Sequence, residues 1–135
     1  GIMKSRIKIT IEYPLMTKSP GIVWSLISNA AGLQKWIANY VTEDGPHMTF
    51  TWGEAWTEQD THTSLILEKK KNQYIRMKWD YIEEDYAYWE MRIEQSEMTG
   101  NLNLVVTDYA YPDDTDYLHD LWDDNLSRLH QISGL

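Results

Sequence analysis

The residues of this chain that could do chemistry are first of all its carboxylates. Glu90 and Glu94 share one face of an alternating stretch with Arg92, and paired carboxylates can act as general acid and base. The opposite face of that stretch is apolar, so the charged face points away from the core. We therefore expect these charges to pair across strands with Arg76 or Lys78.

The four histidines are not spaced like a metal site. His119 and His130 are eleven residues apart on one expected helix, which separates them by about 16 Å along its axis. His47 and His62 lie near the ends of expected strands. The acidic run after Pro112 lacks the glycine and closing glutamate of a calcium loop and suits a helix start. We expect no metal ion.

The sequence also lacks the motifs typical of nucleophilic catalysis and of phosphate binding. The chain has no cysteine, and its serines lack the G-x-S-x-G setting of a hydrolase. No glycine-rich phosphate loop is present. Asp108, near the end of the last expected strand, is the best single acid/base candidate, although it can equally cap or bridge. We assign no catalytic residue and no cofactor.

Large side chains form the most distinctive pattern. The chain holds 7 Trp and 9 Tyr but only 1 Phe, and rings with a polar tip suit cavity walls and interfaces. Methionine adapts to pockets of irregular shape. The candidate ligand-binding residues are those on inward strand faces and on the C-terminal helix: Trp52, Met77, Trp79, Trp89, Met91 and Trp122. The alternative is that they fill the core completely.

A strand and two short helices come first among the elements that must position these residues. Residues 5–13 alternate between apolar and polar, which predicts a half-buried strand. Ser19 is a suitable N-cap and Pro20 a suitable first residue for the next helix. Asn29 and Gly32 interrupt that helix, so a second short helix follows.

About six further strands and a long helix complete the order. Residues 54–69 are predicted to form one bent strand. Residues 86–95 are predicted to form a further strand. Short turns between successive strands predict an antiparallel meander, and its apolar face must be covered. The C-terminal helix supplies a matching apolar stripe: Leu118, Leu121, Trp122, Asn125, Leu129 and Ile132.

Local segments resemble a known superfamily. SPGIVWSLISNAAGLQKWIA resembles the helix pair of the branch typified by the activator of heat-shock-protein-90 ATPase, within the START/polyketide-cyclase (SRPBCC) superfamily. YWEMRIEQSEMTGNLNLVVTDYA and LWDDNLSRLHQI resemble small stand-alone bacterial START-like domains. The resemblance implies one α+β domain, 1–135, with the helix-grip fold: an antiparallel sheet of six or seven strands around a long C-terminal helix. It implies no single chemistry, because the superfamily includes lipid carriers, receptors, cyclases and co-chaperones.

Composition restricts the partners. A net charge of −9 argues against nucleic acid and against anionic membrane surfaces. No apolar run approaches the roughly 18 residues of a spanning helix. The first ten residues lack a signal-peptide core, so we expect a cytoplasmic protein without membrane insertion.

The function predicted from these observations is non-enzymatic binding of a small apolar or lipid-like ligand between sheet and helix. One alternative is a protein-interaction domain similar to the chaperone activator. Tyr86 and Tyr88, on the expected outer face, would then contact a protein partner or a second copy. The second alternative is a cyclase- or hydrolase-like enzyme that depends on Asp108.

Overall fold

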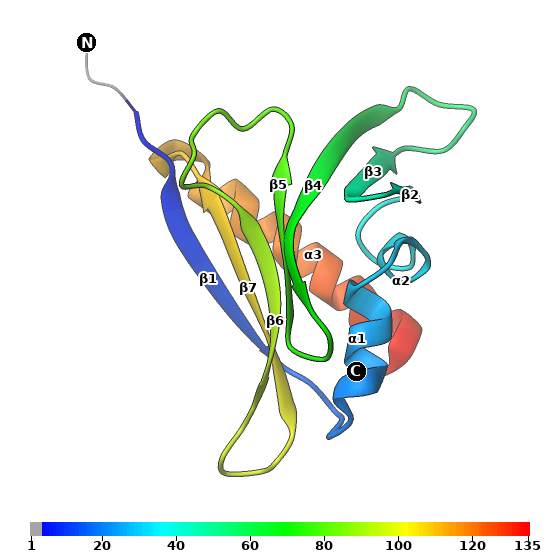
Figure 1. Ribbon diagram of the computed structural model, residues 1–135, viewed down its shortest axis with the longest axis vertical. Helices are drawn as coiled ribbons and strands as arrows, with labels where there is room; N and C mark the ends of the chain where they lie inside the picture. The colour runs from blue at the N-terminus through cyan, green and yellow to red at the C-terminus, as the bar shows by residue number, and fades with distance from the viewer. Residues whose placement is uncertain (1–3) are drawn as a thin grey trace.

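A curved sheet of seven antiparallel strands forms the framework of the protein (Figure 1). The computed structural model describes residues 4–135, so the first three residues of the expected domain lie outside it. The strand order is β1-β7-β6-β5-β4-β3-β2. The strands are β1 (Ile7–Pro14), β2 (Tyr40–Asp44), β3 (His47–Trp52), β4 (Asp60–Lys70), β5 (Tyr74–Trp79), β6 (Trp89–Gln95) and β7 (Leu102–Ala110).

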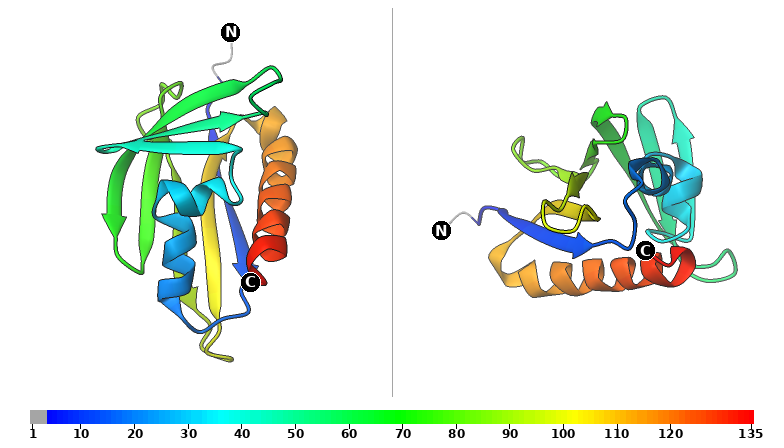
Figure 2. Two further views of the ribbon diagram at one scale, coloured as in Figure 1. Left: turned by 90° about the vertical axis from the view of Figure 1, so that its right-hand side faces the viewer. Right: turned by 90° about the horizontal axis from the view of Figure 1, so that it is seen from below.

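The helices cover one face of this sheet. They are α1 (Pro20–Ile27), α2 (Ala30–Gln34), the short 3-10 helix η1 (Pro112–Asp114) and α3 (Thr115–Ser133). Helix α3 runs across the sheet, and α1 and α2 lie near its C-terminal end (Figure 2). This arrangement confirms the expected α+β helix-grip architecture, with two short helices after the first strand.

Strand β1 lies at one edge of the sheet and pairs with the last strand, β7. Its register with β7 runs from Ile7 opposite Ala110 to Pro14 opposite Asn103. The expected alternation is confirmed, since Ile9 is buried while Lys8 and Thr10 are exposed.

One asparagine holds the turn between α1 and α2, residues 28–29, which we call the elbow. The side chain of Asn29 accepts a hydrogen bond from the Gly32 N–H at 2.8 Å and donates one to the Ser25 carbonyl at 3.2 Å. It therefore caps α2 while also binding the last turn of α1. Ser19 occupies the N-cap position of α1 as expected, but its side chain makes no capping bond. Pro20 at the first helical position leaves one N–H fewer to satisfy.

The buried face of α3 differs slightly from the predicted apolar stripe. Trp122, Asn125 and Leu129 are buried as expected, and Leu126 joins them. Leu121 and Ile132 are 40% and 47% exposed, so their assignment to the buried stripe was wrong. Leu126 lies four residues from Trp122 and three from Leu129, so it completes a continuous row on the helix.

Two predicted strands are shorter than expected. Strand β4 begins at Asp60 because residues 53–59 form a loop, in which the Thr57 N–H donates to the Glu54 carbonyl at 2.9 Å. Strand β6 begins at Trp89 because residues 80–88 form a second loop. The Lys78 ammonium donates to two carbonyls of that loop, including Ala87 at 2.9 Å.

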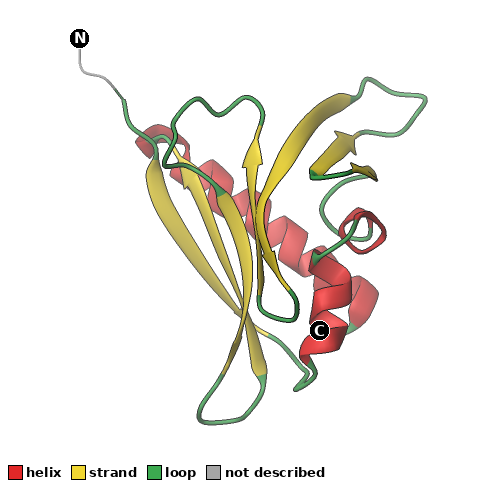
Figure 3. Cartoon of the chain, in the orientation of Figure 1, coloured by secondary structure: helices red, strands yellow, loops and turns green. Residues whose placement is uncertain are grey.

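These two loops lie at the same end of the molecule (Figure 3). The tightly packed core lies between the sheet and the three α-helices, and it includes Trp36, Phe50, Met77 and Met91, none of which is exposed. Side chains do not fill the space at the end of the molecule that carries the loops, and the candidate site lies there.

Candidate ligand-binding pocket

A pocket of about 660 Å³ lies between the curved sheet and the N-terminal half of α3. Strands β3 to β7 and the loop after β5 supply one wall. Tyr117, Leu118, Leu121 and Trp122 of α3 supply the other. The long helix therefore covers the sheet without filling the space at this end.

Four of the six predicted ligand-binding residues line the pocket: Trp52, Trp79, Trp89 and Trp122. Met77 and Met91 do not line it, and both are completely buried. They lie two residues from Trp79 and Trp89 along β5 and β6, on the same strand faces, where the core is closed. The binding role of the tryptophans remains a prediction.

The aromatic wall is held in a defined arrangement. Trp79 stacks on Trp89 with ring centroids 5.0 Å apart and on Tyr81 at 6.1 Å. The Trp89 indole N–H donates to Ser64 Oγ at 2.9 Å, and the Trp52 indole N–H donates to the Ile37 carbonyl at 2.9 Å. Because the indole N–H groups of Trp89 and Trp52 are already bonded, these two rings offer the pocket apolar surface.

Asp108 brings a carboxyl group into this apolar surrounding. It follows Val106 at the inward-facing positions of β7, and it lines the pocket. The Trp122 indole N–H donates to its Oδ2 at 2.9 Å, and the Tyr109 backbone N–H donates to its Oδ1 at 2.8 Å. Burial nevertheless raises the pKa of Asp108 from 3.8 to about 6, because desolvation outweighs these bonds.

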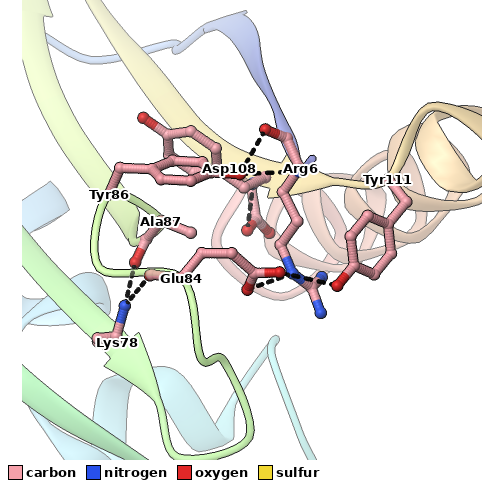
Figure 4. Close-up of polar contacts among 8 residues, drawn as sticks. Arg6, Lys78, Glu84, Tyr86, Ala87, Asp108 and Tyr111 are labelled. Carbon is pink, nitrogen blue, oxygen red and sulfur yellow. Dashed lines mark hydrogen bonds and ion pairs between the residues drawn. The ribbon is translucent and has the colours of Figure 1, made fainter. Parts of the chain in front are cut away.

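A polar network holds the rim of the pocket (Figure 4). Arg6 Nε donates to Glu84 Oε2 at 3.1 Å, and the Tyr111 hydroxyl donates to Glu84 Oε1 at 2.7 Å. These bonds, led by that from Tyr111, lower the pKa of Glu84. The hydroxyl of Tyr86 accepts from the Arg6 backbone N–H at 2.9 Å and donates to the Arg6 carbonyl at 3.1 Å. The loop after β5 is thereby fastened to the start of β1 and the end of β7.

Sequence reasoning missed several lining residues, chiefly Arg6, His62 and Tyr81. His62 had a usable signal, since it precedes the buried Ser64 by two positions and so faces inward. Its ring lies 4.8 Å from that of Tyr81, and burial raises the pKa of Tyr81 to about 12. Arg6 lies before β1, and alternation gave no reason to place it at the pocket.

A family model for the START-like superfamily domain matches residues 3–135. The chain belongs to the START-like superfamily. A Bacteroides fragilis protein solved by solution NMR shares 34% identity with this START-like domain, over 96% of this chain and 92% of that one, with a TM-score of 0.63. A comparison with curated proteins finds no match.

Two more distant structures share the fold of this START-like domain. The Aha1 dimer of Colwellia psychrerythraea has 13% identity and a TM-score of 0.65, with 93% of this chain and 92% of that one covered. The protein XoxI of Bacillus cereus has 16% identity and a TM-score of 0.70, with 93% and 94% covered. At these identities the likeness concerns the fold alone.

The second charged cluster of the START-like domain lies outside the pocket. Glu90 accepts from Arg76 Nη2 at 2.8 Å and from Arg92 Nη2 at 3.3 Å. The expected cross-strand pairing with Arg76 is confirmed, whereas Lys78 binds loop carbonyls instead. Glu90 is almost fully buried beneath the two guanidinium groups, although it belongs to the outer face.

Within residues 4–135, no group of three or more His, Asp or Glu side chains is placed to hold a metal ion. No helix in this described part of the chain combines the length and apolar character needed to cross a membrane.

We predict that the stability of Asp108→Asn relative to the wild type rises by about 1–3 kcal/mol between pH 4 and pH 7.5, since one pKa unit corresponds to about 1.4 kcal/mol. An amide has one acceptor oxygen, so the variant also loses one of the two N–H bonds to this side chain, a cost that does not depend on pH. The pKa of Asp108 is raised to about 6 in the folded state, so the folded state binds more protons than the unfolded one between pH 3.8 and 6. Wild-type stability therefore falls as the pH rises through this range and stays lower above it.

Urea unfolding of both proteins at several pH values measures this difference. The difference in stability between variant and wild type should shift in favour of the variant from pH 4 to pH 7.5, because the substituted amide is always neutral and the wild-type carboxyl of the folded state is mostly protonated at pH 4. A gap that is constant with pH would contradict the assignment to this carboxyl.

Proposed function

We propose that this START-like domain binds a small apolar or lipid-like molecule in the tryptophan-lined pocket and carries out no reaction on it. One observation carries the proposal: the pocket of about 660 Å³ lies beside a core that is separately packed. Ligand pockets usually measure about 300–1,000 Å³ and have mainly apolar walls with a few polar groups. Four tryptophans and the partly buried carboxyl of Asp108 fit that description.

The position of the pocket supports access for a ligand. Leu121, on the α3 wall, is 40% exposed, and the lining continues to Tyr117, which is 72% exposed. The lining thus extends from solvent to the fully buried Trp89, which is 1% exposed. A molecule entering past α3 would exchange water for indole surface.

We predict that Leu121→Trp weakens the binding of N-phenyl-1-naphthylamine, a neutral apolar probe, by about tenfold or more, equivalent to about 1.4 kcal/mol. The larger indole would occupy space at the α3 wall of the pocket. Saturable probe fluorescence and quenching of protein tryptophan emission measure the binding. The matched control is Ile132→Trp, which places the same side chain at an exposed position of α3 outside the lining.

Circular dichroism establishes that both variants are folded. The control should bind the probe like the wild type. Absence of saturable binding to the wild type would contradict the proposed function, and equal weakening by both variants would place the probe elsewhere.

Protein contact through the outer face is the second candidate function. Tyr86 is 47% exposed, and its ring lies edge-on to Tyr109, which in turn contacts Tyr88 with centroids 5.2 Å apart. Tyr88 and Tyr109 are partly buried beside Tyr86, and an aromatic cluster that reaches the surface suits an interface. The Aha1 structure of similar fold is a dimer, which favours self-association here. A sedimentation coefficient that rises with protein concentration would support this candidate.

An enzyme is the least supported of the three readings. It would need a second acid/base group in contact with Asp108, whereas the bonds to this carboxyl come from the Trp122 indole and the Tyr109 backbone. Glu90 and Arg92 bind one another on the outer face. A cytoplasmic location remains a prediction from sequence.

A further inference from the structure

The lining of the pocket carries an excess of negative charge. It contains the carboxyl groups of Asp60, Asp108 and Asp114, and Arg6 is the one Lys or Arg side chain among the described residues that line it. The Arg6 guanidinium is already occupied, since its Nε lies 3.1 Å from Glu84 Oε2 and its centre lies 4.3 Å above the Tyr111 ring. The one Lys or Arg group of the described lining is therefore paired with a glutamate outside it. Of the three carboxyl groups, Asp60 lies at the solvent side, 3.2 Å from the His62 ring.

Asp108 lies deepest among these carboxyl groups, and neutral donors alone bind it. Its two oxygens accept from the Trp122 indole N–H and the Tyr109 backbone N–H. Among residues 4–135, no Lys, Arg or His nitrogen lies within 4.0 Å of it. Because its pKa is about 6, Asp108 is mostly ionised at pH 7.5. In the described part of the chain, Arg6 is the one positive charge that lowers the pKa of Asp108; its effect is smaller than that of desolvation, and it is already paired with Glu84. A cation bound beside Asp108 would therefore offset the cost of desolvating this carboxylate.

The walls around this carboxylate are also suited to a positive group. The faces of tryptophan and tyrosine rings attract cations that lie within about 6 Å of the ring centroid. Trp52, Trp79 and Tyr81 line the same pocket as Asp108. The net charge of −9 on the whole chain raises the local concentration of cations further.

We infer that the pocket takes an amphiphilic organic cation, with its ammonium group beside Asp108 and its apolar body against the tryptophan wall. The inference rests on the proposed function, because it specifies the class of ligand for the same pocket. An anionic head group would meet the carboxylates of Asp60, Asp108 and Asp114, and a neutral one would leave Asp108 with only Arg6, already paired with Glu84, as a positive charge.

Three probes with the same tail and different head groups test the charge preference: octyltrimethylammonium, 1-octanol and octyl sulfate. Isothermal titration at pH 7.5 should show the cation binding at least about tenfold more tightly than the alcohol, since cation–π and charge contacts add about 1–2 kcal/mol. Octyl sulfate should bind most weakly. Binding of the alcohol as tightly as the cation would overturn this inference and leave the proposed function standing. Failure of all three probes to bind would overturn both.

A charge-removing variant tests the position of the head group. Asp108→Asn keeps the shape of the side chain and should reduce the preference for the cation over the alcohol to about threefold or less. The matched control is Asp124→Asn, which removes the same charge from an exposed position of α3 outside the lining. The control should keep the preference, and an equal loss in both variants would overturn the assignment to this pocket.

The Trp122 indole gives a second readout that needs no variant. Its N–H is bonded to Asp108, so its ¹H–¹⁵N resonance should shift most when the cation is added. A larger shift with octyl sulfate would place the ammonium group elsewhere and overturn the proposal.

Discussion

Trp36→Ala is expected to lower the free energy of unfolding by about 3–5 kcal/mol, the usual cost of removing a fully buried tryptophan. Trp36 is not exposed at all, and its indole N–H donates to the Leu26 carbonyl at 2.8 Å. Its ring centroid lies 6.2 Å from that of Trp122, and its carbonyl accepts from Arg128 Nε at 3.1 Å. The residue, which follows α2, therefore joins the end of α2 to α1 and α3.

Trp56→Ala is the matched control for this substitution. Trp56 lies in the loop of residues 53–59 and is 81% exposed, so its removal should change stability by at most about 0.5 kcal/mol. Urea unfolding followed by far-ultraviolet circular dichroism measures both variants without depending on tryptophan emission. A Trp36→Ala variant within about 1 kcal/mol of the wild type, the contribution of a single hydrogen bond, would contradict the joining role.

Gly32→Ala is expected to destabilise the domain by about 3 kcal/mol, at the upper end of the cost of overpacking. A Cβ at this position would lie 2.2 Å from the Ser25 carbonyl oxygen and 2.9 Å from the Leu26 Cα. Both are backbone atoms of α1, so no side chain can rotate away. Helices α1 and α2 would have to separate, which would disturb the buried Leu33.

Gly21→Ala provides the contrast. Gly21 lies in α1 with nothing within 4 Å of the position that a Cβ would take. Alanine is favoured over glycine in a helix by about 0.5–1 kcal/mol, so this variant should be slightly more stable than the wild type. Thermal or urea unfolding compares the pair, and similar stabilities for the two variants would refute the close contact at Gly32.

The fold could be predicted from sequence wherever the pattern was local and periodic. Alternation located β1 to within two residues at its start, and the Asn29 and Gly32 pair located the elbow. Strand bounds were wrong where a loop has the composition of a strand. Residues 54–59 carry no strong turn signal after Gly53, and the bonds that bend them become evident only in three dimensions.

The sequence could predict which strand residues face inward, but not which of them line the pocket. Alternation placed Trp79 and Met77 on the same inward face of β5, and both do point inward. Only Trp79 reaches the pocket, because Met77 is enclosed by the core cluster and is not exposed at all. Arg6 and Glu84 are 78 residues apart in sequence, so no local pattern could reveal that they meet at the rim.

The pairing of β1 with β7 also determines when this domain can fold. Ile7 must find Ala110, and all the residues between them have to be made before that contact exists. Strands β2 to β7 pair with their neighbours in sequence and can form as they leave the ribosome. Strand β1 stays unpaired, with its apolar face exposed, until β7 has been made. We expect its docking to be the late step of refolding, with the rate dominated by this long-range closure.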